Sequence, residues 1–80
     1  MLKDEILDII VDVCEEEDVR EDLSLDLFEE GLLDSLAVAQ LLMELEDKLG
    51  IVIALTEIEK SDINTPEKII ALAEKRKAEG

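Results

Sequence analysis

Residues 31–50 read GLLDSLAVAQLLMELEDKLG, and this stretch decides which fold the chain can form. From Ser35 onward its apolar residues recur at spacings of three and four, which is the periodicity of an amphipathic helix and not of a strand. The sequence therefore predicts a helix over residues 35–49, ended by Gly50, because glycine readily adopts the left-handed conformation that follows many helices. The face expected to meet a core consists of Val38, Leu41, Leu42, Leu45 and Leu49.

The same helix carries a second, narrower apolar stripe with polar neighbours. Its apolar members are Leu36, Ala39 and Met43, and the polar residues that flank them are Gln40, Glu46 and Asp47. A small core can use only one of the two stripes well. The second stripe is therefore left without an expected place in the core.

Two segments precede this helix. Residues 2–16 place apolar residues at helical spacing with acidic residues opposite, which predicts an amphipathic helix. Leu7 and Val11 widen its apolar face, so we expect this helix to pack against more than one neighbour. Residues 23–34 have no sustained period and are predicted to form a long ordered loop that large apolar residues hold to the core. Gly31 should supply a turn there that a side chain would hinder.

Two short segments and one helix follow. Residues 51–55 are apolar, and because no second strand is available to pair with them, they are predicted to form a buried connector. Residues 56–60 can make one short helical turn, and Thr65 and Pro66 should cap and begin the last helix. The expected fold is an all-α bundle of three main helices and one short helix, in a single domain of residues 1–80.

The charge of the chain is strongly negative and unevenly distributed. The formal net charge is −15, and residues 1–34 hold 14 acids and two bases, whereas residues 35–80 hold nine acids and six bases. Nucleic acid is therefore not an expected partner, since its binders need a basic face. Acidic residues interrupt the apolar start of the chain, and no stretch is long enough for a membrane span. We expect a cytoplasmic protein without direct membrane insertion.

Several kinds of chemistry are excluded by the residues that the chain lacks. It has no histidine and only one cysteine, Cys14, which is too few ligands for a structural zinc site. Cys14 lies on an apolar helical stripe and is predicted to be buried. A serine nucleophile would need a base, usually histidine, and nothing in the sequence indicates an apolar pocket that could tune paired carboxylates. We therefore predict no metal site, no catalytic residues and no enzyme.

One motif stands out once these alternatives are removed. In Gly31-Leu32-Leu33-Asp34-Ser35-Leu36 a hydroxyl group begins a helix directly after a turn, with apolar residues around it. The motif is open to two interpretations. Asp34 and Ser35 can form an ordinary helix cap, since both residue types are good caps, or Ser35 can be a modified serine.

At this motif the sequence resembles the acyl carrier superfamily, in which a serine of an Asp-Ser-Leu motif begins the second helix of a four-helix bundle. The resemblance covers nearly the whole chain. Residues 27–36, LFEEGLLDSL, and residues 62–69, DINTPEKI, look most like the D-alanyl carrier proteins of teichoic acid D-alanylation. Asp-Ser-Leu alone is weakly specific, whereas the two motifs at this separation are strongly specific.

The resemblance implies a cofactor, a cargo and a set of partners. Ser35 would bear 4′-phosphopantetheine, added from coenzyme A by a phosphopantetheinyl transferase, and the thiol would carry D-alanine as a thioester. A separate D-alanine-activating ligase would load this thioester, and a membrane-bound O-acyltransferase system would use it to modify lipoteichoic acid of the cell wall. The carrier itself would be a non-catalytic monomer. Its partner-binding residues would be Asp34, Leu36, Ala39, Gln40, Met43, Glu46 and Asp47. The second stripe of the helix over residues 35–49 would then dock partners with basic rims, the alternative being that it packs on a neighbouring loop.

Two other functions stay open at this point. The first is a carrier of another cargo, such as a fatty acid, polyketide or nonribosomal peptide. The second is an acidic helical interaction protein without a cofactor, which would use the charge but not Ser35.

Overall fold

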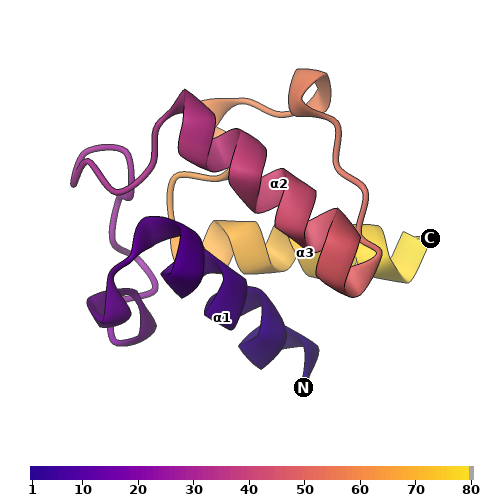
Figure 1. Cartoon of the computed structure of the whole chain (residues 1–80), viewed down its shortest axis with the longest axis horizontal. Helices are drawn as coiled ribbons and strands as arrows, with labels where there is room; N and C mark the ends of the chain where they lie inside the picture. The colour runs from indigo at the N-terminus through magenta and orange to yellow at the C-terminus, as the bar shows by residue number, and fades with distance from the viewer. Residues whose placement is uncertain (80) are drawn as a thin grey trace.

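The computed structural model describes residues 1–79 of the chain. It contains three α-helices, α1 (Leu2–Cys14), α2 (Ser35–Leu49) and α3 (Pro66–Glu79). Three short 3-10 turns complete it, η1 (Glu17–Arg20), η2 (Leu55–Glu57) and η3 (Lys60–Asp62). No strand occurs among the described residues, and the predicted all-α, acyl-carrier-like fold class is confirmed. Helix α1 packs against both α2 and α3, as its wide apolar face predicts (Figure 1).

The ends of the helices follow local signals in the sequence. Helix α2 has the predicted bounds, and Gly50 ends it in the left-handed conformation with φ of 68°. Thr65 and Pro66 also act as predicted, since the Thr65 hydroxyl accepts a hydrogen bond from the Lys68 backbone N–H at 3.3 Å. Helix α1 ends at Cys14, two residues earlier than predicted, because Glu15 adopts a left-handed conformation with φ of 56°.

The segment between α2 and α3 departs from the prediction in two ways. The apolar run after Gly50 is not a buried connector, because Ile51 and Ile53 are buried but Val52 and Leu55 are more than half exposed. Extended backbone turns successive side chains to opposite sides, which explains the alternation from Ile51 to Ile53. Leu55 is not part of this alternation, because it begins η2. The single turn predicted over residues 56–60 is also wrong in its bounds, since two separate turns, η2 and η3, occupy this part of the chain.

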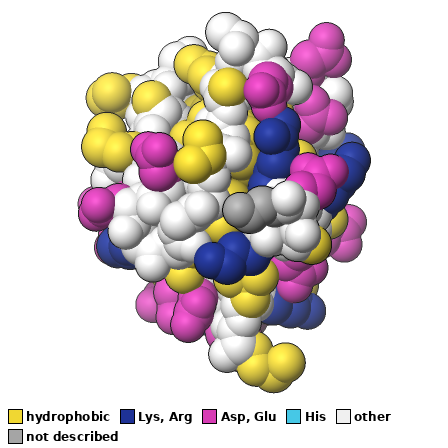
Figure 2. Space-filling model, turned by 90° about the vertical axis from the view of Figure 1, so that its right-hand side faces the viewer, with side chains coloured by type: hydrophobic (Ala, Val, Ile, Leu, Met, Phe, Trp, Pro, Cys, Tyr) yellow, Lys and Arg dark blue, Asp and Glu magenta, His cyan; other side chains and the backbone are white. Residues whose placement is uncertain are grey.

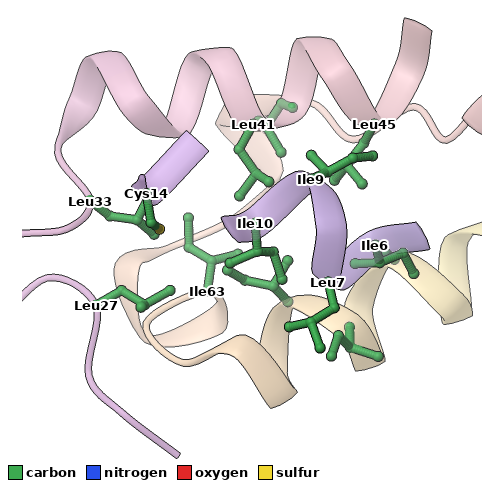
Figure 3. Packing of buried hydrophobic residues seen from close by; sticks show 14 of the residues in the cluster. Ile6, Leu7, Ile9, Ile10, Cys14, Leu27, Leu33, Leu41, Leu45 and Ile63 are labelled. Carbon is green, nitrogen blue, oxygen red and sulfur yellow. The ribbon is translucent and has the colours of Figure 1, made fainter. Parts of the chain in front are cut away.

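The core is aliphatic and draws on every part of the chain. Figure 3 shows side chains of α1 together with Leu41 and Leu45 of α2, Leu27 and Leu33 of the long loop, and Ile63 before α3. Leu27 is fully buried, so the prediction that apolar residues hold the loop to the core is confirmed. Backbone hydrogen bonds support the same attachment, because the Leu27 N–H donates to the Asn64 carbonyl at 2.7 Å.

Cys14 is buried at the end of α1, as predicted. Burial raises the pKa of its thiol to about 11, because the charged thiolate is poorly solvated inside the protein. The folded state therefore favours the neutral thiol, and this contribution to stability is lost as the pH rises from the ordinary thiol pKa through about 11.

We predict that the folded protein resists thiol reagents. At pH 8 Cys14 should react with Ellman's reagent roughly a hundredfold more slowly than in the urea-unfolded chain, since a raised pKa leaves less thiolate. Absorbance kinetics in buffer and in urea measure both rates. Equal rates in the two conditions would contradict the burial of this thiol.

No helix within residues 1–79 is long and apolar enough to cross a membrane.

Candidate functional site

Ser35 begins α2 with its hydroxyl group unused. Asp34 precedes it in extended conformation, and the Asp34 carboxylate accepts a hydrogen bond from the Ala37 backbone N–H at 2.8 Å. Asp34 is therefore the helix cap. Ser35 is exposed, and its side chain makes no hydrogen bond within residues 1–79. The ordinary cap expected at Asp34 and Ser35 is thus present and is formed by Asp34, while the Ser35 hydroxyl group remains free.

The turn before Ser35 is fixed by its own backbone. The carbonyl of Leu27 accepts hydrogen bonds from the N–H groups of Leu32 and Leu33, at 2.9 and 3.1 Å. Gly31 lies in this turn with φ of 74°, a conformation that side chains disfavour, so the role predicted for this glycine is confirmed. The chain therefore enters α2 from a closed turn and not from a loose linker.

Asp26 holds this turn to the segment before α3, a role that the sequence analysis missed. Its carboxylate accepts hydrogen bonds from the Glu29 and Phe28 N–H groups and from the Asn64 side chain. These donors lower the pKa of Asp26, with the Glu29 backbone hydrogen bond as the largest cause. An aspartate at the start of a turn is a recognisable local signal, but its contact with Asn64 is not.

A pocket of about 270 Å³ opens beside Ser35. Most of its walls are apolar and come from the loop, from α2 and from the segment around η2 and η3. Sequence reasoning did not foresee an apolar pocket, but Glu59 is the only acidic residue among those that line it, so it holds no pair of carboxylates. The residues that line this pocket, which we call the Ser35 pocket, are Phe28, Ser35, Val38, Leu55, Ile58, Glu59, Lys60 and Ile63.

The second stripe of α2 faces solvent. Leu36 is 79% exposed and Met43 is 65% exposed, which contradicts the alternative that these side chains pack on a neighbouring loop. Ala39, Gln40, Glu46 and Asp47 are exposed as well. Val52 and Leu55 add two exposed apolar side chains that sequence reasoning had placed in the core. Figure 2 shows hydrophobic side chains gathered on the upper part of one face with acidic side chains among them.

Removal of the Asp34 carboxylate should weaken the start of α2. We predict that Asp34→Ala lowers the free energy of unfolding by about 1 kcal/mol, because the Ala37 N–H loses its acceptor. Asp34→Asn should retain most of this stability, since an asparagine side chain also accepts the bond. Urea unfolding of the three proteins measures the difference. Equal stability of the alanine variant and the parent would show that the cap contributes nothing.

Comparison with known proteins gives a consistent assignment. The family model described as "Phosphopantetheine attachment site" matches residues 4–73. A D-alanyl carrier protein of Lacticaseibacillus casei is 44% identical over 73 residues, which cover 91% of this chain and 90% of that protein. One from Bacillus velezensis is 41% identical over 68 residues, or 85% of this chain and 87% of the relative. One from Abiotrophia defectiva is 39% identical over 77 residues, covering 96% of this chain and 98% of the relative.

The resemblance inferred from residues 27–36 and 62–69 is therefore confirmed along most of the chain, including the part that contains Ser35. The chain belongs to the phosphopantetheine attachment site family and, within it, to the D-alanyl carrier proteins.

Proposed function

We propose that this protein carries D-alanine as a thioester on a 4′-phosphopantetheine arm attached to Ser35, for the D-alanylation of teichoic acids. The observation that carries the proposal is the free, exposed hydroxyl of Ser35 at the start of a helix that Asp34 already caps. Similarity to D-alanyl carrier proteins over 91–96% of the chain supports the choice of cargo.

The residues around Ser35 fit a phosphodiester. Helix starts favour negative charge because their backbone N–H groups point outward, and here the bond from Ala37 to Asp34 satisfies only one of them. Attachment would join the Ser35 oxygen to a phosphorus of coenzyme A and break the P–O bond to adenosine 3′,5′-bisphosphate. The hydroxyl proton would pass to a base of the transferase, since this chain has no histidine.

The chain contributes position and recognition and does not itself catalyse. When bound, the arm supplies the thiol that holds the cargo. A phosphopantetheinyl transferase attaches it, a D-alanine-activating ligase loads it, and a membrane-bound O-acyltransferase system takes up the cargo. The exposed side chains of Leu36, Ala39 and Met43, with Gln40, Glu46 and Asp47 beside them, form the surface on which these partners dock. Loading takes place in the cytoplasm, and the carrier acts as a monomer.

A two-stage mass measurement tests the proposal. The protein is incubated with coenzyme A and a broad-specificity phosphopantetheinyl transferase, and then with ATP, D-alanine and a D-alanine ligase. Intact mass spectrometry should show one added arm and then one D-alanyl group, whereas L-alanine should add little. If the arm attaches but D-alanine does not, the cargo is wrong. If no arm attaches to the folded protein, the carrier function is wrong.

A further inference from the structure

The Ser35 pocket is lined by both apolar and polar residues. Ser35 is one of the polar residues, and the apolar side chains are those of Phe28, Val38, Leu55, Ile58 and Ile63. Lys60 is the only cationic residue among those that line it. A free serine hydroxyl, a cation and an apolar surface therefore meet in one cavity, and the carrier role described above does not by itself use the last two.

Lys60 is held near this pocket by an aromatic ring. Its ammonium nitrogen lies 5.4 Å from the centroid of Phe28, the only aromatic residue of the chain. A cation over a ring face is attracted by the electrons of that face. Because Phe28 belongs to the turn that leads into α2, the contact joins η3 to the turn that positions Ser35.

The ammonium group of Lys60 is not paired with a carboxylate of the described residues. Within the described part of the chain it forms no ion pair, whereas Arg20, Lys48 and Arg76 each pair with an acidic side chain. Glu59 is the one acidic residue that lines the same pocket, and its backbone N–H donates to the Asp62 carboxylate at 2.8 Å. In a chain with a net charge of −15, an unpaired cation that lines the same pocket as the serine favours an anion there.

We propose that Lys60 pairs with the phosphodiester on Ser35, and that the apolar walls of the Ser35 pocket receive the dimethyl-substituted carbon of the arm next to that phosphate. This inference rests on the proposed function. The phosphodiester is anionic and the following carbon bears two methyl groups, so the start of the arm matches a cation followed by an apolar surface. Lys60 then acts as a positioning residue. The far end of the arm, with its thiol, stays free to reach other proteins.

NMR of the isotope-labelled holo-protein tests this arrangement. We expect nuclear Overhauser effects between the geminal methyl groups of the arm and the side chains of Leu55 and Ile58, which line the pocket. In Lys60→Gln these signals should weaken about two- to fivefold, the range for a partly exposed ion pair, and the ³¹P resonance of the phosphodiester should move. Lys60→Arg should retain both, because it keeps the charge.

A matched control separates this contact from a general loss of charge. Lys75→Gln removes the same charge from an exposed position of α3 that does not line the pocket, and it should leave the signals unchanged. An absence of arm-to-pocket signals in the parent, or equal signals in Lys60→Gln, would overturn the inference. Intact mass of each sample shows whether the arm is attached. An arm on Ser35 without these contacts contradicts the role of Lys60 only, whereas the absence of the arm contradicts the proposed carrier function.

Discussion

Replacement of Ser35 by alanine should abolish attachment of phosphopantetheine while leaving the protein folded. The hydroxyl oxygen is the atom that would bond to phosphorus, so its removal leaves nothing to modify. The fold should tolerate the change because Ser35 is exposed, makes no hydrogen bond within residues 1–79, and is not the helix cap. Alanine also has the highest helix propensity, so α2 should be at least as stable.

The chain offers a matched control for this experiment. Its other serines are Ser24 and Ser61, and Ser61 is exposed in η3 without a side-chain hydrogen bond among the described residues. After incubation with coenzyme A and transferase, intact mass spectrometry should show one arm on the parent and on Ser61→Ala, and none on Ser35→Ala. Circular dichroism should show equal helix content in all three. An arm on folded Ser35→Ala would place the attachment site elsewhere.

Truncation of Leu27 should cause a large loss of stability. We expect Leu27→Ala to lower the free energy of unfolding by about 2–5 kcal/mol, because its fully buried side chain would leave a cavity in the core. The loss should also loosen the turn before Ser35, since the carbonyl of residue 27 holds Leu32 and Leu33 through two hydrogen bonds. Such a cost is a large part of the stability of a typical small domain.

Leu36→Ala is the control for Leu27→Ala. It removes the same atoms from a side chain that is 79% exposed, and it should change stability by no more than about 0.5 kcal/mol. Urea denaturation followed by circular dichroism gives both values. The same two variants distinguish an effect on folding from an effect on partner recognition. Leu27→Ala should lower stability, whereas Leu36→Ala should slow attachment of the arm or loading of D-alanine. A small, equal effect at both positions would mean that the loop is not anchored as the structure shows.

The parts of the fold predicted correctly depend on local signals. The bounds of α2, the left-handed Gly50 and the cap formed by Thr65 and Pro66 each follow from a few neighbouring residues. The predicted end of α1 lies two residues beyond the observed one, because charged residues occur both within helices and in the segments that follow them. The left-handed Glu15 carries no glycine signal that would mark the stop.

The missed features depend on contacts between distant segments. Whether Val52 and Leu55 face the core or solvent is decided by how the connector passes over α2, and hydrophobicity alone does not show this. The Ser35 pocket likewise forms only when the loop, α2 and η3 come together. At the site itself, Ser35 and the exposed stripe of α2 were found from motif and periodicity, whereas Lys60 over Phe28 had no local signal.

The hydrogen bonds of residues 23–27 to residues 64–67 tie the loop before Ser35 to the start of the last helix. The Leu27 N–H donates to Asn64, the Glu67 N–H donates to Leu23, and both bonds cross from the loop to the start of α3. The loop that leads into the turn before Ser35 therefore cannot leave the core without breaking its junction with the last helix. The amide protons of this loop should exchange with solvent as slowly as those of α3, because both segments open together in one cooperative unfolding event. An enzyme that recognises this turn thereby selects chains whose C-terminal helix has already docked.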